Sequence, residues 1–122
     1  MLKGSKTLLV VVRQPPYGSS LARASLDTAL AAAALEQPVR LLFMGDGVLQ
    51  LLPHQESKAI GQKNIGRLLA SLPLYGIESV YIDARAAARY RLEPRDLVVP
   101  TEPMDPAAIR GLITSCDHVI GF

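Results

Sequence analysis

Tryptophan is absent from this 122-residue chain, and aromatic residues make up only 5% of it. The core must therefore be built from leucine, valine, isoleucine and alanine, because few aromatic side chains are available to fill it. The single cysteine, Cys116, excludes an internal disulfide framework and indicates a reducing compartment. These absences predict a small cytoplasmic globular protein.

A strong charge of one sign is also missing, since the formal net charge is only +2. Such a small charge does not predict direct binding to nucleic acid. No apolar run approaches the roughly 20 residues that span a bilayer, so no membrane anchor is expected. The apolar run Leu8–Val12 ends at Arg13, shorter than the ~7–15 residues of a signal-peptide core. We therefore expect a first β-strand there.

Short apolar runs alternate with helical patterns along the whole chain, with no linker or repeat between them. We expect strands at about residues 7–12, 39–44, 78–82, 97–99 and 117–122. We expect helices at about residues 20–36, 48–52, 61–72 and 84–90, and a last one beginning at residues 105–106. Strands that alternate with helices form right-handed crossovers with helices on both faces. The fold class predicted for residues 1–122 is one α/β domain, a three-layer α/β/α sandwich with a mainly parallel sheet of about five strands.

Residues 40–55 form the most informative segment. An uninterrupted apolar run over residues 41–44 is typical of a strand buried on both faces. Gly45, Asp46 and Gly47 then form a tight turn, and an apolar piece over residues 48–52 stops at Pro53. The turn is expected at the carboxyl edge of the sheet, where open α/β sheets usually hold ligands or partners.

This segment resembles the DsrE/DsrF/DsrH family of small sulfur-relay proteins, and within it the DsrF or TusC subunit. The resemblance spans nearly the whole chain and rests on residues 44–48, 50–53 and Gln55, supported by residues 16–20 and 74–78. It implies a heterohexamer with two copies each of three paralogues, corresponding to TusB (DsrH-like), TusC (DsrF-like) and TusD (DsrE-like). The complex would pass persulfide sulfur to further carrier proteins, toward 2-thiolation of the tRNA wobble uridine. In sulfur-oxidising organisms the similar complex works with dissimilatory sulfite reductase.

Carrier subunits of this family present a cysteine near the end of the third strand and the start of the next helix. Residues 81–85 occupy that place here and contain Asp83 but no sulfur. The resemblance therefore implies a non-catalytic partner subunit, not an enzyme by itself. Four apolar side chains on the short helix after Asp46 cannot all face inward, so contacts with other subunits are expected at Asp46, Val48, Leu49, Leu51 and Leu52. The alternative is that the four apolar residues complete the core of this domain.

Cys116 is the candidate for the alternative function, a persulfide carrier of the sulfurtransferase class. We expect it at the carboxyl end of the last helix, where the helix dipole and Asp117 disfavour a thiolate, and with no helix N-terminus or cation beside it. It also precedes its strand, which places it at the sheet edge opposite the turn at Asp46. A structural thiol is the favoured interpretation. Asp46 itself could cap the following helix, face a subunit contact, or bond its own backbone in the turn.

No metal or cofactor is expected. His54 and His118 lie far apart, and no Cys, His, Asp or Glu has a metal-ligand spacing. Gly18, Ser19 and Ser20 could hold an anion at a helix N-terminus, as a stand-alone ligand-binding domain would require, but helix capping explains them better. Asp83 and Glu102 are expected together at the carboxyl edge, either as a carboxylate pair or as separate solvated groups.

Overall fold

The computed structural model describes residues 6–16, 20–53 and 65–122. Its strands are β1 (Leu8–Val12), β2 (Val39–Phe43), β3 (Ser79–Asp83), β4 (Glu102–Met104) and β5 (His118–Gly121). Its α-helices are α1 (Leu21–Ala34), α2 (Ile65–Ser71), α3 (Ala84–Arg89) and α4 (Pro106–Ser115). Three short 3-10 helices are η1 (Gly45–Leu51), η2 (Leu72–Tyr75) and η3 (Pro94–Asp96). No helix in the described ranges is long and apolar enough to cross a bilayer.

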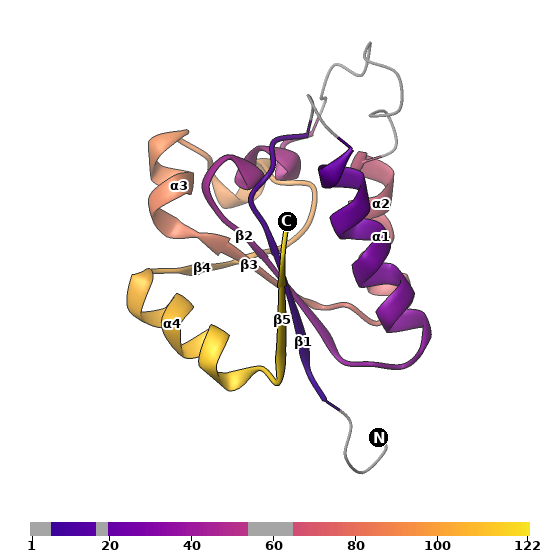
Figure 1. Cartoon of the computed structure of the whole chain (residues 1–122). Helices are drawn as coiled ribbons and strands as arrows, with labels where there is room; N and C mark the ends of the chain where they lie inside the picture. Colours follow the sequence, from indigo (N-terminus) through magenta and orange to yellow (C-terminus); the bar gives the residue numbers. More distant parts are fainter. Residues whose placement is uncertain (1–5, 17–19, 54–64) are drawn as a thin grey trace.

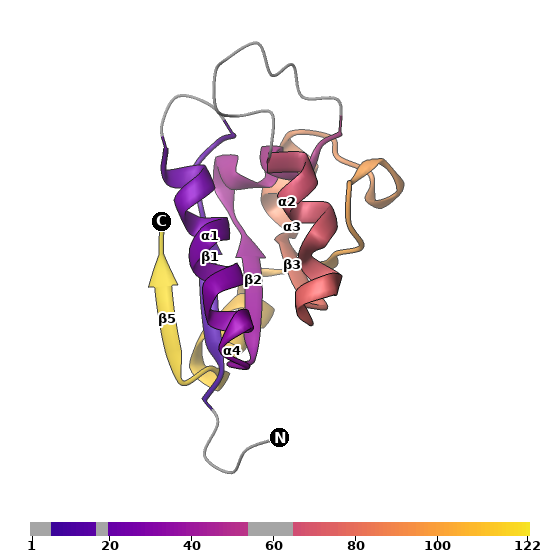
Figure 2. The same cartoon turned by 90° about the vertical axis from the view of Figure 1, so that its right-hand side faces the viewer.

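The five strands form one sheet in the order β4-β3-β2-β1-β5, and each neighbouring pair is parallel. Every residue of β1 is buried, which explains its uninterrupted apolar sequence, since this strand has a neighbour on each side and helices over both faces. Figure 2 shows β5 at one margin of the sheet, with β1 between it and β2. The predicted α/β class with a parallel sheet is confirmed.

The helices cover the two faces of the sheet unequally. The chain moves from β1 through β2 and β3 to β4 in one direction, so right-handed crossovers place α1, α2 and α3 on the same face. The larger core cluster lies there and includes Leu26 of α1, Leu69 of α2 and Ala86 of α3. The return from β4 to β5 reverses direction, and α4 covers the other face with Ile109 and Leu112. Figure 1 shows α1 and α4 on opposite sides of β1 and β5.

The predicted fourth strand at residues 97–99 is wrong, because β4 lies at Glu102–Met104. The apolar run instead packs on the larger core cluster as a loop, and the Val98 N–H donates to the Leu51 carbonyl at 2.8 Å. The observed strand contains Pro103, which has no N–H to donate. A strand at the sheet edge tolerates proline, and β4 is an edge strand.

Two helices end in left-handed residues that are not glycine. Glu36 follows α1 with φ 64°, and Arg91 follows α3 with φ 57°. In each case backbone N–H groups return to the last turn: Gln37 donates to Ala32, and Leu92 donates to Ala87. This pattern is the Schellman motif, which usually has glycine in the left-handed position.

Candidate functional site at the carboxyl edge of the sheet

Three segments meet where β1, β2 and β3 end. The chain leaves β1 through Arg13 and Gln14, η1 begins two residues after β2, and α3 begins directly after β3. The helices η1 and α3 contact each other. The carboxyl edge is therefore formed mainly by η1, the segment that the sequence singled out.

Asp46 joins these segments through its side chain. Its Oδ1 accepts a short hydrogen bond from the hydroxyl of Tyr90, which follows α3. The N-cap residue of η1 is Met44, and no side-chain capping bond is made there. Neither the capping role nor the own-backbone turn describes Asp46 here, because its carboxylate bonds a residue 44 positions away. The side chain remains exposed, so a contact with another subunit is still open to it.

The apolar residues of η1 divide between the core and the surface. Val48 and Leu51 have no exposed surface and belong to the larger core cluster. Leu49 and Leu52 are half-buried. The alternative that these residues complete this domain's own core therefore holds for Val48 and Leu51. A subunit contact on η1 has to be sought at Asp46, Leu49 and Leu52.

Gly47 holds η1 against the end of β1. A Cβ placed on this residue would lie 2.1 Å from the Val12 carbonyl oxygen, closer than any side chain allows. The Met44 N–H also donates to this oxygen, at 2.9 Å. Only glycine permits this approach of two backbones. The sequence marked Gly47 as a turn residue, but it gave no sign that β1 would be the neighbour.

Gln50 is a site residue that sequence reasoning missed. Its side chain is fully buried, and its Nε2 donates to the Gln14 carbonyl at 2.7 Å. This bond ties η1 to the segment after β1. The Oε1 atom is buried without a hydrogen-bond partner. The sequence did offer one sign of this role. Gln50 stands between Leu49 and Leu51 on a very short helix, where a polar side chain has to find a hydrogen-bond partner if it is buried with them.

Asp83 caps α3. Its Oδ1 accepts hydrogen bonds from the backbone N–H groups of Arg85 at 3.0 Å and Ala86 at 3.4 Å. The carboxylate thereby satisfies the N-terminal donors of its own helix. The expectation that Asp83 and Glu102 lie together at the carboxyl edge is wrong, because Glu102 is level with Tyr81 while Asp83 is level with Met104. Glu102 lies at the start of its strand and is exposed.

Cys116 lies at the opposite edge of the sheet, as predicted. It follows α4 as its C-cap residue and is only partly buried. The expectation that no cation stands beside it is wrong, because an Nη1 atom of Arg40 lies 3.9 Å from its sulfur. Arg40 is the second residue of β2, which enters the sheet at this edge. Cys116 and the η1 segment are therefore separated by the length of the strands.

The remaining candidates do not assemble into a site. His118 is exposed at the start of β5, and no group of three metal-ligating side chains occurs in the described part of the chain. Ser20 is the N-cap residue of α1 but makes no side-chain capping bond. Gly18, Ser19 and His54 lie outside the described residues.

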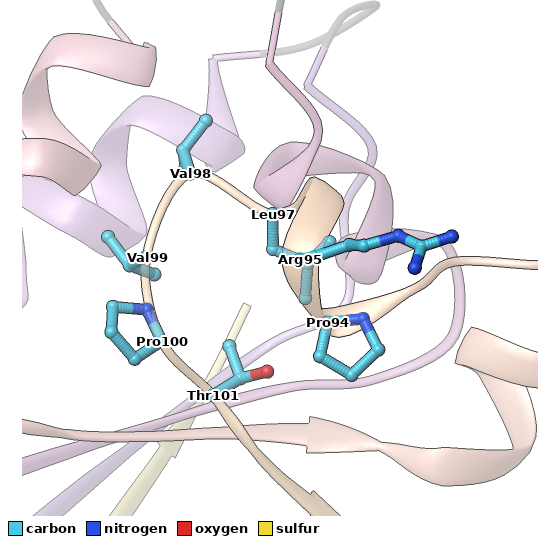
Figure 3. A pocket seen from close by; sticks show the side chains of 7 residues that line it. All are labelled: Pro94, Arg95, Leu97, Val98, Val99, Pro100 and Thr101. Atoms are coloured by element: carbon cyan, nitrogen blue, oxygen red, sulfur yellow. The ribbon is translucent and has the colours of Figure 1, made fainter.

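The loop between α3 and β4 lines a pocket of about 420 Å³ (Figure 3). Its lining comes from residues 94–101 without Asp96 and is mostly apolar. The guanidinium group of Arg95 extends away from the other lining side chains (Figure 3). A smaller pocket of about 170 Å³ shares Val99 and Pro100 with it. Neither pocket gathers the convergent polar groups of a small-molecule site.

Sequence comparison identifies the family. The profile of the DsrE/DsrF-like family matches residues 6–122. The chain belongs to the DsrE/DsrF-like family. The resemblance seen in the sequence is thereby confirmed.

Two TusC homologs are similar to this chain over nearly their whole length. A TusC homolog of Pseudomonas aeruginosa is 37% identical over 116 residues, covering 95% of this chain and 98% of that protein. A TusC homolog of Pasteurella multocida is 35% identical over 117 residues, covering 94% and 98%. The crystal structure of the ychN protein from E. coli superposes with a TM-score of 0.83 at 23% identity, covering 96% of this chain and 99% of that one. The last similarity confirms the fold.

The resemblance places the cysteine of carrier subunits within residues 81–85 of this chain, a segment that contains Asp83 and no sulfur. That place is the junction of β3 and α3, where a helix N-terminus favours a thiolate. Here the junction holds a carboxylate that is bonded to its own helix. A carboxylate cannot form a persulfide, so the carrier chemistry has no nucleophile at this position.

Proposed function

We propose that this chain is a non-catalytic subunit of a sulfur-relay complex of the TusC or DsrF type. The observation that carries the proposal is Asp83, which caps α3 at the junction where a carrier subunit would hold its cysteine. The similarity to two TusC homologs supports it. The chain would contribute by assembly and would not hold the sulfur itself.

The partners in this proposal are paralogues of the TusB or DsrH type and of the TusD or DsrE type, two copies of each in a heterohexamer. The contact surface would lie on η1 and use the exposed Asp46 together with the half-buried Leu49 and Leu52. Val48 and Leu51 would support it from below, because they anchor η1 in the core. The Tyr90 bond to Asp46 would hold this surface in place from the side of α3.

The final acceptor in this proposal is the wobble uridine of tRNA, thiolated at position 2 through further sulfur carriers. The single cysteine fits the reducing cytoplasm as the place of that reaction. A relay for dissimilatory sulfur oxidation is the alternative within the same class. A deletion strain separates the two, because loss of thiolated tRNA supports the first and retained thiolation with lost sulfur oxidation supports the second.

A second candidate function is a persulfide carrier that uses Cys116. The contact with Arg40 is the observation in its favour, because it places a hydrogen-bond donor with a positive charge 3.9 Å from the sulfur. Its place at the amino edge, after the C-terminal end of α4, argues against it. A Cys116→Ser variant decides: undiminished sulfur transfer in the assembled complex eliminates this candidate, and loss of transfer establishes it.

The first experiment is affinity purification of the tagged chain from its source cells, followed by intact-mass analysis. We expect two small companions in equal amounts, one with a cysteine that gains about 32 Da, the mass of one sulfur atom. Purification without companions, with the added sulfur on Cys116 itself, would overturn the proposal. The same preparation of the Cys116→Ser variant serves as the control for added mass on this chain.

A further inference from the structure

The outer edge of β5 has no neighbouring strand in the described part of the chain. β5 is last in the strand order, and all four of its residues are exposed. Figure 2 shows it at the margin of the sheet. Its two β-branched side chains, Val119 and Ile120, are 44% and 40% exposed. An apolar strand edge of this kind is a ready template for pairing with another strand.

The hydrogen bonds to β1 determine which backbone groups of β5 face outward. His118 donates to Thr7, Phe122 donates to Val11, and the Phe122 carbonyl accepts from Arg13. The backbone N–H and C=O groups of residues 118 and 122 therefore point toward β1. Because these groups alternate in direction along a strand, those of Ile120 point toward β1 as well. The N–H and C=O groups of Val119 and Gly121 point to the open side.

The opposite edge of the sheet is protected against such pairing. β4 has only three residues and contains Pro103, which lacks an N–H, and the charged Glu102. β5 contains neither proline nor a charged side chain. The two margins differ in the features that natural sheets use to prevent association, so a further strand is expected at β5 only.

We propose that β5 pairs in antiparallel fashion with β5 of a second copy of this chain, across a two-fold axis at Ile120. In this register Val119 lies opposite Gly121 of the second copy, and the outward backbone groups of both residues form reciprocal hydrogen bonds. Val119 and Gly121 share the face covered by α4, because they are level with Leu9 and Val11. Gly121 has no side chain, which leaves room for the Val119 side chain of the second copy. The two copies of β5 therefore fit each other in this register.

The other face of the proposed junction brings the two Ile120 side chains together. Ile120 is level with Val10, on the face covered by α1. The pairing removes this exposed apolar surface from water and creates one continuous sheet through both copies. A closed two-fold contact uses both β5 edges and leaves none open for further growth. The proposal does not depend on the sulfur-relay role.

Cysteine cross-linking of the full chain tests the register. In a Cys116→Ser background, Ile120→Cys places two sulfurs across the axis in a pair with Cα atoms about 4.5 Å apart, within the range that a disulfide bridges. His118→Cys is the matched control on the same face. The two copies of this residue are offset by four positions, roughly 13 Å along the strand.

We expect Ile120→Cys to form a disulfide-linked dimer under mild oxidation and His118→Cys to stay monomeric on non-reducing gels. Cross-linking through His118→Cys, or equal cross-linking of both variants, overturns the proposed register. Light scattering of the wild-type chain gives a second measurement. A chain that is monomeric up to its solubility limit overturns the dimer, and so does a chain that associates only with a paralogue.

A Val119→Pro variant separates pairing from folding. It removes an N–H that points outward, and the bonds from β5 to β1 are kept. We expect the dimer to be lost while circular dichroism and the unfolding midpoint stay close to those of the wild-type monomer. A Val119→Pro chain that remains dimeric overturns the proposal.

Discussion

Gly47 connects the sequence of η1 to the position of the candidate site. Its backbone lies directly against the Val12 carbonyl, and this contact sets the distance between η1 and the sheet. The buried Gln50 makes a second connection, through its bond to Gln14. The surface formed by Asp46, Leu49 and Leu52 is therefore held by two contacts that lie beneath it.

Replacing Gly47 with alanine should destabilise the chain by about 2–3 kcal/mol, because the added methyl group must displace β1 or η1. Gly111→Ala is the matched control, since a Cβ there meets no atom within 4 Å and lies inside α4. That substitution should stabilise the chain by about 0.5–1 kcal/mol. Urea denaturation measures both. A Gly47→Ala chain as stable as the Gly111→Ala chain would contradict the close approach.

At the scale of elements, the ends of α1 and α3 carry a conformational cost. Glu36 and Arg91 adopt left-handed backbone that a residue with a Cβ adopts at a penalty. Gly76, the C-cap of η2, adopts the same conformation with φ 80° and without this penalty, because glycine has no Cβ. The Schellman motif thus ends all three of these helices, with glycine in the left-handed position of η2 and a residue with a Cβ in that position of α1 and α3.

Glu36→Gly should raise the free energy of unfolding by about 0.5–1 kcal/mol, because the left-handed position no longer strains a side chain. Glu36 is exposed, and no bond of its side chain is lost in the described structure. The reverse change, Gly76→Ala, should lower stability by a similar amount although the space around it is open. Thermal unfolding of the two variants beside the wild type checks both signs. Equal unfolding midpoints for all three chains would show that the left-handed backbone at these positions does not affect stability.

Element type was predictable where the apolar period was distinctive. β1, β2 and α1 lie within two residues of their predicted bounds, because buried parallel strands and a long helix leave clear patterns. Residues 97–99 misled the prediction, since a short apolar run looks the same in a strand and in a loop packed on a core. The sequence also could not show which apolar residues of η1 are buried. Val48 and Leu51 face inward only because of where η1 lies against β1.

At the scale of the whole molecule, assembly should depend on the exposed part of η1. Leu49→Glu and Leu52→Glu, made separately, should each abolish copurification of companion subunits, because a charge is placed in an apolar contact. Leu35→Glu is the control, since Leu35 is 82% exposed beyond the end of α1. Quantitative mass spectrometry of the purified complexes gives the readout, with thermal unfolding to confirm that each chain is folded.

Loss of companions from Leu35→Glu as well would show that charge alone disturbs the complex. Full retention in both η1 variants would move the contact away from this surface. Asp46→Ala adds a change that removes no core side chain, and it should weaken copurification without a large loss of stability. Retained companions in this variant would limit the contact to the two leucines.

The pairing of β1 with β5 also affects how the chain is made. Thr7 donates to the carboxylate of Asp117, a separation of 110 residues along the chain. During synthesis β1 can pair with β2 early, but its other side has no strand beside it until β5 has been translated. The growing chain therefore carries an apolar strand with one open edge until its last strand has been made. Docking of the last strand is therefore the step that closes this edge.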